Sequence, residues 1–279
     1  MDLIVFLAVL AGAAMHAGWN ALVKTGLDRT TSIFLLALIQ GAISLALLPL
    51  FAMPSALSWP WILVSAFLHS GYKIFLIRAY EHGDMSQVYP LARGSAPLIV
   101  AVAGVFLLQE NLTATKLAAV CAIGLGVMLM SSRLGSGEAM PKKALLFALG
   151  TALFTASYTL VDGIGAQLSG TASGFTLWMF VGDGVLMTIY ALLVRGRDLR
   201  AAVRGNLLSG TAAGALSLGS YWIAIWAFTL APIALVAALR ETSVLFAMLI
   251  AVFFLGEKAS RQRWAAAALI LAGIVLMRL

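Results

Sequence analysis

The sequence contains few charged residues and only one cysteine. Of its 279 residues, 10% are Asp, Glu, Lys or Arg and 62% are hydrophobic, and the mean hydropathy is +1.01. A water-soluble globular domain has about 25% charged residues, so this composition excludes that class. The lone Cys121 excludes an internal disulfide and a paired-cysteine metal or redox site. The composition therefore predicts an integral membrane protein.

Several motifs that mark enzymes are also missing. The chain has no GxxxxGK[ST] phosphate-binding loop, no HExxH, no GxSxG and no GxGxxG. These absences argue against ATP-driven pumping and against metallopeptidase or hydrolase chemistry. We expect no catalytic residue, no cofactor and no metal site, and an ion or solute gradient as the source of energy.

Apolar runs of about 20 residues, the length that crosses a bilayer core, recur along the chain. They are continuously apolar rather than alternating, which indicates helices and not barrel strands. The first run has no preceding Lys or Arg and no small-residue cleavage site, so we expect it to remain in the mature chain. The ten predicted helices are Leu3–Val23, Ser32–Met53, Trp59–Tyr80, Val88–Leu108, Thr113–Ser132, Leu145–Ile164, Phe175–Val194, Leu207–Leu230, Ile233–Leu255 and Ser260–Leu279.

The loops between these helices divide the basic residues unequally. The side that holds the termini carries only Lys116 and Arg278. The positive-inside rule then makes the basic loops cytoplasmic and puts both termini outside, in a bacterial-type inner (plasma) membrane. We expect these loops to contact membrane lipids and not nucleic acid, because they lie at headgroup level. The thirteen basic residues of the other side are Lys24, Arg29, Arg78, Arg133, Lys142, Lys143, Arg195, Arg197, Arg200, Arg204, Lys258, Arg261 and Arg263.

An internal repeat links the two halves of the chain. Moving residues 88–130 forward by 147 positions aligns them without a gap to residues 235–277, so that Arg93 falls on Arg240 and Glu110 on Glu257. Five helices per half is an odd number, so the second copy must cross the membrane in the opposite sense. We predict an all-α polytopic membrane protein with ten transmembrane helices in two inverted-topology repeats. The repeats are 1–132 and 144–279, joined by a cytoplasmic linker at 133–143.

Particular segments resemble a known family. "ENLTATKLAAVCAIGLGVMLM" and "GEKASRQRWAAAALILAGIVLM", each after a helix with an internal Arg, are similar to the ten-helix EamA-domain members of the drug/metabolite transporter superfamily. "MHAGWNALVK" and "AYEHGDMSQVYPLARGSAPLIVAVAG" are similar to one branch of it. The resemblance implies a transporter for amino acids, vitamins, nucleotide-linked sugars or other metabolites. Many members keep both termini in the cytoplasm, whereas the loop charges here predict the reverse.

Of the charged residues in the predicted helices, we take six to lie within the membrane. Each would cost about 2.5–3.5 kcal/mol if it faced lipid, so they must face the interior or one another. Arg93 and Arg240 each lie about eight residues, ~12 Å, from opposite membrane faces, near the midplane where inverted-repeat transporters bind solute. The six are Lys73, Arg93, Asp162, Asp183, Arg240 and Glu241.

Polar side chains recur at helical spacing and give single polar faces that can line one cavity. The candidate substrate-binding or gating residues are Arg93, Arg240, Glu241, Lys73, Tyr89, His16, Trp19, Asn20, His69, Tyr158, Asp183 and Tyr221. A structural role is the alternative for the arginines, which would then pair with Glu241 or Asp183, and for the histidines. Pro90 and Pro97 flank Arg93 and favour bending of that helix.

These residues predict a secondary active transporter that works by alternating access. The slight cationic excess inside the membrane favours a small polar solute that is zwitterionic or anionic, such as an amino-acid-like metabolite or an organic anion. A proton or a counter-solute is the expected driving gradient, and the protein is expected to be a monomer or weak dimer. The alternatives are a membrane-embedded enzyme acting on a lipid or small molecule, and an exporter of lipophilic drugs.

Overall fold

The computed structural model describes residues 1–23, 29–83, 85–131, 140–195, 207–253, 256 and 258–279, without the side chains of 21–23, 29–30, 85–87, 89–90, 131, 195 and 207–209. In these residues all regular secondary structure is helical. The α-helices are α1 (Leu3–Val23), α2 (Arg29–Leu47), α3 (Trp59–His82), α4 (Met85–Phe106), α5 (Ala114–Ser131), α6 (Lys142–Ser169), α7 (Ala172–Arg195), α9 (Leu207–Phe228), α10 (Ile233–Arg240), α11 (Ser243–Phe253) and α12 (Arg261–Leu276), with short 3₁₀ turns at Leu48–Leu50 and Ala56–Ser58.

The helices have the length and composition of membrane spans. Seven described spans are long and apolar enough to cross a bilayer, and 91–106 and 114–130 form shorter apolar helices. Large apolar side chains such as Leu63 and Leu193 are exposed at 65% and 82%. An exterior of this kind suits lipid rather than water. The chain is therefore a multi-pass membrane protein, as the composition predicted.

Proline and glycine set several helix ends. The second predicted helix reaches Met53, but α2 stops at Leu47, where a 3₁₀ turn containing Pro49 follows. Proline has no N–H to continue the α-helical bonding, which explains the early end. At the corner between α6 and α7, Gly170 adopts a φ of 69°, a left-handed conformation that side chains disfavour.

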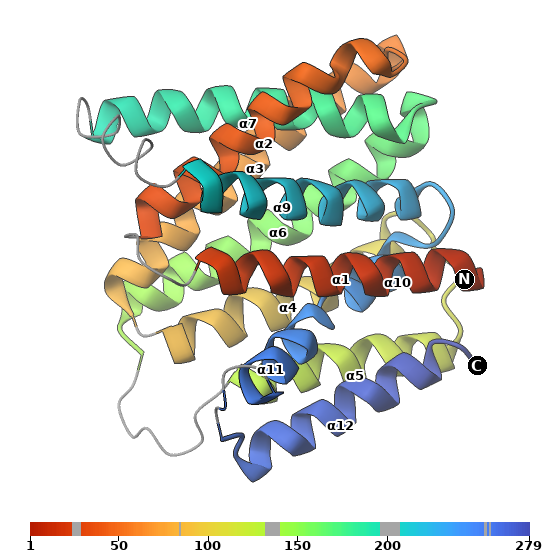
Figure 1. Ribbon diagram of the computed structural model, residues 1–279. Helices are drawn as coiled ribbons and strands as arrows, with labels where there is room; N and C mark the ends of the chain where they lie inside the picture. Colours follow the sequence, from red (N-terminus) through yellow and green to blue (C-terminus); the bar gives the residue numbers. More distant parts are fainter. Residues whose placement is uncertain (24–28, 84, 132–139, 196–206, 254–255, 257) are drawn as a thin grey trace.

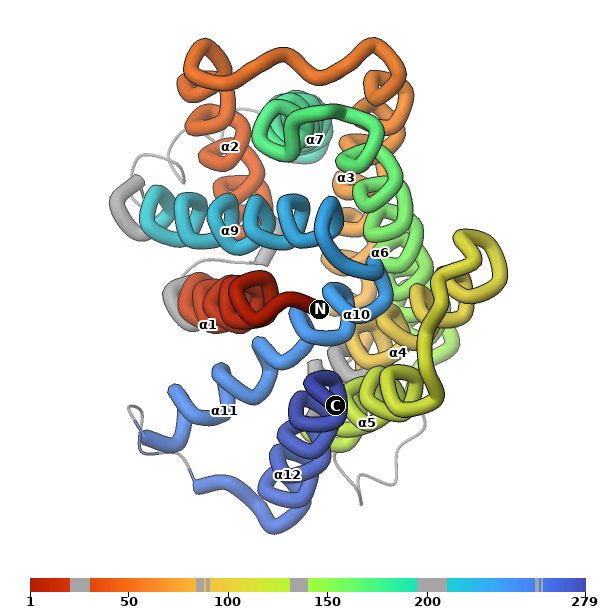
Figure 2. Tube along the Cα trace, turned by 90° about the vertical axis from the view of Figure 1, so that its right-hand side faces the viewer, coloured from red at the N-terminus to blue at the C-terminus, as the bar shows by residue number. Residues whose placement is uncertain are grey.

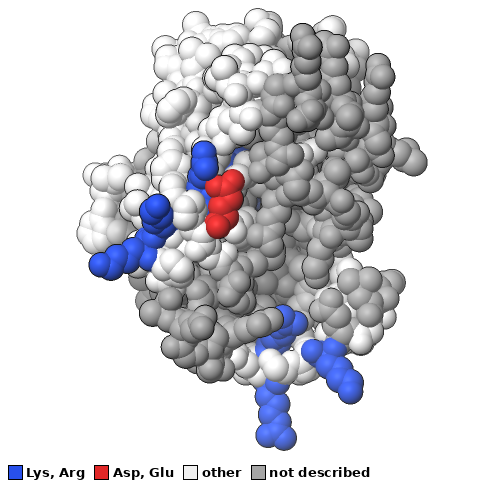
Figure 3. Space-filling model, turned by 90° about the vertical axis from the view of Figure 1, so that its left-hand side faces the viewer, with Lys and Arg blue, Asp and Glu red and all other residues white. Residues whose placement is uncertain are grey.

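The helices form a bundle with both termini at the same end (Figure 1). α1 packs against α9, α3 against α6, α2 against α7 and α5 against α12, and Figure 2 shows the same neighbours from another side. The opposite end of the bundle, viewed in Figure 3, carries mostly Lys and Arg among its charged side chains. The helix ends that lie there carry Arg78 near the end of α3, Lys142 and Lys143 at the start of α6, and Lys258, Arg261 and Arg263 at the start of α12.

One expected helix is interrupted. The ninth predicted helix, Ile233–Leu255, was expected to be continuous, but α10 ends at Arg240 and α11 begins at Ser243. Between them the Glu241 amide donates to Ala238 O and the Thr242 amide to Leu239 O, at 3.1 and 3.2 Å. These bonds span three residues instead of four, so the backbone tightens into a 3₁₀ turn in the middle of the span. The break places Arg240 and Glu241 at the junction.

The fourth helix, which contains Pro90 and Pro97, was predicted to bend during gating. In this structure α4 runs from Met85 to Phe106 without interruption. A proline removes one backbone hydrogen bond, and neighbouring helices can compensate for that loss in a buried span. The interruption falls instead in the α10–α11 span, which has no internal proline.

Candidate functional site

The six charged side chains that were predicted to avoid lipid face the protein interior. Lys73, Arg93, Asp162, Asp183 and Glu241 are at most 6% exposed. Arg240 alone among them is only partly buried. The expectation that these residues avoid lipid is confirmed. They separate into three groups of contacts.

The first group joins the two halves of the chain. Arg93 Nε on α4 lies 3.2 Å from Oε2 of Glu241, at the α10–α11 junction. A guanidinium nitrogen of Arg93 also lies 3.1 Å from Nε2 of His16 on α1. A guanidinium can only donate, so His16 Nε2 is the acceptor and this histidine is the neutral tautomer protonated on Nδ1. The Trp19 ring packs edge-on against His16, with centroids 5.1 Å apart.

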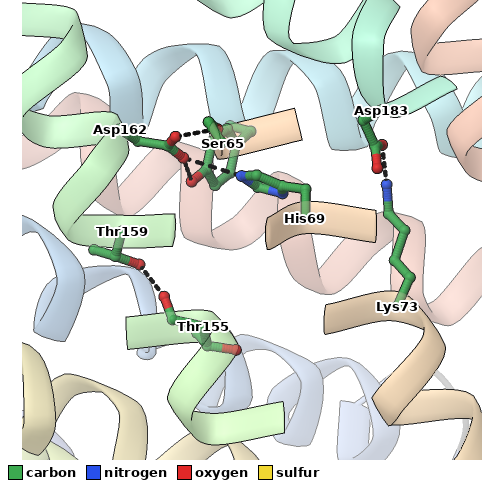
Figure 4. A network of polar contacts seen from close by, with 8 residues as sticks. Ser65, His69, Lys73, Thr155, Thr159, Asp162 and Asp183 are labelled. Atoms are coloured by element: carbon green, nitrogen blue, oxygen red, sulfur yellow. Dashed lines mark hydrogen bonds and ion pairs between the residues drawn. The ribbon is translucent and has the colours of Figure 1, made fainter. Parts of the chain in front are cut away.

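The second group surrounds Asp162 of α6. Its carboxylate accepts hydrogen bonds from the hydroxyls of Ser65 and Tyr221, and His69 Nε2 lies 3.0 Å from Oδ2. Figure 4 shows Asp162 pointing toward Ser65 and His69, which come from α3. The His69 ring stacks on Tyr158 with centroids 4.0 Å apart. The carboxylate is thus satisfied by three donors from two other helices.

Arg240 has a different environment. Its guanidinium carbon lies 4.5 Å from the centre of the Tyr221 ring, a cation–π contact. Among the described residues, no carboxylate forms an ion pair with it. Tyr221 therefore contacts Asp162 through its hydroxyl and Arg240 through its ring face.

The third group is an ion pair between α3 and α7. Lys73 Nζ donates to Asp183 Oδ2, and Ser70 Oγ donates to Oδ1 at 2.9 Å. Figure 4 shows this pair apart from Asp162 and its partners. The sequence suggested that Asp183 would pair with an arginine. It pairs with Lys73 instead, because α7 packs directly on α3.

Not every candidate joins these groups. Asn20 Nδ2 donates at 2.8 Å to the carbonyl of His16 in its own helix, so this bond links α1 to no other element. Tyr89 lies in α4, but its side chain is outside the described part of the structure. Asp162, Ser65 and Ser70 were not among the candidates. The signal for Asp162 was its charge inside a predicted helix, and the signal for Ser65 and Ser70 was their spacing of four and three residues from His69 and Lys73 on α3.

Glu110 lies beyond the end of α4, and its side chain caps the N-terminus of α10. Its Oε1 accepts from the Ile233 amide at 2.5 Å, and Oε2 from the Ala234 amide at 3.3 Å. The first amides of a helix have no partner within the helix, and a carboxylate there is also favoured by the helix dipole. Glu110 thus holds α10 to the α4–α5 connection. Its repeat counterpart Glu257 lies outside the described residues.

Comparisons with known proteins agree with the architecture. The model of the EamA-like transporter family matches residues 3–132 and 142–279. Of the solved structures, 28 chains match. One of them, described only as the crystal structure of a protein, is 16% identical, covers 98% of this chain and 94% of its own, and has a TM-score of 0.75. At that identity the likeness concerns the fold alone. A comparison with curated proteins gives no match.

Proposed function

Since the chain belongs to the EamA-like transporter family, we propose that it is a secondary active transporter for a small polar solute with an anionic group. The solute is zwitterionic or anionic and crosses the membrane by alternating access around the interior charged groups. A lipophilic-drug exporter would have little need for an interior cation such as Arg240, which forms no ion pair within the described part of the chain. An embedded enzyme would instead need a nucleophile or paired carboxylates near one membrane face.

The proposal rests on the exposure and the contacts of Arg240. Five of the six interior charges are buried and held by partners, whereas Arg240 is partly exposed, lies over the face of Tyr221 and forms no ion pair with a carboxylate of the described residues. A guanidinium presents paired donors that suit a carboxylate or phosphonate. Its position at the end of α10, beside the break in the span, is typical of transporter binding sites.

Reciprocal contacts support the proposed inverted repeat. A Cβ on Gly126 would lie 2.6 Å from Ile270 Cγ1, and a Cβ on Gly273 would lie 2.7 Å from Ile123 Cγ1. Residues 126 and 273, like 123 and 270, differ by the same 147 positions as Arg93 and Arg240. A two-fold relationship between α5 and α12 produces this kind of mutual contact.

α2 and α7 also approach closely, at a pair of glycines whose positions differ by 143 rather than 147. A Cβ on Gly41 of α2 would lie 3.2 Å from Gly184 Cα, and a Cβ on Gly184 of α7 would lie 3.1 Å from Gly41 Cα. The packing of α3 on α6 likewise has a counterpart in α9 on α1. In the proposed ten-span arrangement the halves move relative to one another around the Arg93–Glu241 contact, with the basic loops cytoplasmic and both termini outside.

Transport in proteoliposomes tests the proposal. Purified protein is reconstituted and assayed with labelled alanine, glutamate, pyruvate and 2-aminoethylphosphonate, and with tetraphenylphosphonium as a lipophilic cation. We expect saturable uptake of at least one solute with an anionic group, recovered chemically unchanged. Uptake of tetraphenylphosphonium alone, or recovery of a converted product, would contradict the proposal.

The role of Arg240 is tested with a matched pair of variants. Arg240→Gln should raise the KM for that solute at least about tenfold, the equivalent of about 1.4 kcal/mol. The control is Arg278→Gln, because Arg278 also lies over an aromatic ring, 5.4 Å from the centre of Phe6, but at the terminal end of the bundle. Equal KM values for the two variants would show that Arg240 does not bind the solute.

A further inference from the structure

We propose that the pair formed by His69 and Asp162 is a proton-binding site, and that it takes up one proton for each monoanionic solute bound at Arg240. The protein would then be an electroneutral proton–anion symporter. This inference rests on the proposed function. It adds the identity of the coupling ion and the residues that carry it.

The surroundings of the two interior histidines distinguish them. Nε2 of His16 accepts from Arg93 at 3.1 Å, so a proton added there would lose that bond and face a guanidinium. Nε2 of His69 faces the Asp162 carboxylate at 3.0 Å, where positive charge on the imidazole is favoured. The geometry therefore points to His69 as the interior histidine that can gain a proton.

The charges of the interior set the number of protons. Lys73 is paired with Asp183 and Arg93 with Glu241. Of the interior charges that the structure describes, Arg240 and Asp162 remain, with opposite charges, so this set is neutral when both histidines are neutral. An anionic solute at Arg240 leaves the interior with one negative charge. One proton on the His69–Asp162 pair restores neutrality, and an uncompensated charge is strongly disfavoured within a membrane.

A single side chain links the two sites. Tyr221 donates its hydroxyl to Asp162, and its ring face lies under Arg240 at 4.5 Å. An anion that draws Arg240 away from the ring changes the contacts of the same tyrosine that holds Asp162. Tyr221 can therefore couple solute binding at Arg240 to protonation of the His69–Asp162 pair.

The other groups around His69 and Asp162 are apolar or already bound to partners, so the added proton is placed on this pair. Tyr158 of α6 stacks on His69, and Ser65 of α3 donates to Asp162. From α7, Phe180 contributes an apolar ring 6.1 Å from His69, and the acidic residue of that helix, Asp183, is already bound by Lys73 and Ser70. From α9 and α10 come Tyr221 and Arg240. Asp162 is the carboxylate that contacts His69 among the described residues.

The experiment uses proteoliposomes that contain a pH-sensitive dye, with pyruvate and glutamate as probes. An inward proton gradient should drive uptake, with one proton entering per monoanion, and a potassium–valinomycin potential should leave the rate unchanged. His69→Gln and Asp162→Asn should still exchange labelled for unlabelled anion but lose stimulation by the gradient. Tyr221→Phe keeps the ring under Arg240 and should lower the proton-to-anion ratio.

The control is His82→Gln, because His82 is the third histidine and bonds only to the Arg78 carbonyl among its described neighbours. It should retain the wild-type ratio. A wild-type ratio in His69→Gln, or wild-type uptake indifferent to the proton gradient, overturns the inference while leaving anion transport standing.

A second measurement does not depend on transport. Infrared difference spectra of the purified protein, recorded at low and at high pH, should show protonation that is missing in both His69→Gln and Asp162→Asn. Identical titrations in all three proteins overturn the proton site. Failure of wild type to move any anion, with the titration intact, contradicts the proposed function instead.

Discussion

The Nε atom of Arg93 lies 3.2 Å from Oε2 of Glu241, and both side chains are 8% exposed. The contact joins α4 to the α10–α11 junction, so it ties the first half of the chain to the second. Burying two charges is costly, and their attraction offsets that cost only while both are present. The pair therefore holds this conformation of the bundle together.

Removal of one partner of this pair should destabilise the protein more than removal of both. Arg93→Gln removes the cation beside the buried Glu241, and Glu241→Gln removes the carboxylate beside the buried Arg93, each with an expected cost of about 3–5 kcal/mol. The double variant should recover most of the lost thermal stability but not transport. Detergent-solubilised protein would be compared by thermal unfolding and by uptake. A double variant as unstable as the singles would show that each residue acts through other contacts.

The Lys73–Asp183 pair offers a contrasting case. Its charges are satisfied within α3 and α7, and we expect a mainly structural role. Lys73→Met combined with Asp183→Leu should leave stability within about 1 kcal/mol of wild type or above it, since apolar replacements of a buried pair are often neutral or stabilising. Uptake should persist. Loss of uptake in a stable double variant would place the pair in solute binding.

The close approach of α2 and α7 leaves no room for side chains. A Cβ on Gly41 would meet Gly184 Cα and Phe180 O, both at 3.2 Å. Gly41→Val should cost about 1–3 kcal/mol through overpacking, seen as a lower unfolding temperature. Gly18→Ala is the control, because its Cβ would meet only Leu216 Cδ1 at 3.9 Å. Similar melting of both variants would mean that the helices separate readily.

Glu110 should contribute more to the stability of the protein than Glu81 does. Glu110→Ala removes the acceptor for the Ile233 and Ala234 amides and should cost about 1 kcal/mol. Glu81→Ala breaks only an exposed pair with Arg78, expected to be worth at most about 0.5 kcal/mol. The unfolding temperatures of the two variants test this prediction. An equal decrease in both would show that Glu110 does not stabilise the start of α10.

The proposed orientation is open to chemical labelling. In a background with Cys121→Ser, cysteines at the exposed positions Thr115 and Lys143 lie at opposite ends of the bundle. A membrane-impermeant maleimide added to intact cells should label Thr115→Cys and spare Lys143→Cys. The reverse pattern would put the termini in the cytoplasm. Permeabilised cells, in which both should react, provide the control.

Much of the fold follows from composition because lipid imposes strong rules on a chain. Continuous apolar runs must be helical, so segments such as 3–23 were located almost to the residue. Interior charges were also predictable, since facing lipid is costly. The ends of α2 and α6 depended on weaker signals from Pro49 and Gly170, and the predicted boundaries shifted there.

The partners of the interior charges were harder to predict. The sequence identifies Asp183 and Asp162 as intramembrane acids but not which basic residue each faces, because that depends on how helices pack across the bundle. The break after Arg240 has no proline or glycine to mark it. It arises from a local change in backbone bonding that the surrounding helices stabilise, which a single sequence does not reveal.

The interruption between α10 and α11 has no equivalent in the continuous α4, although the two spans are aligned by the repeat. A solute bound between the two halves would meet helix ends near residues 240–243 on one side and an unbroken helix on the other. The activation barriers for admission from the two faces would then differ. We expect such a carrier to show different apparent affinities in right-side-out and inverted vesicles, even though the overall equilibrium is fixed by the gradients alone.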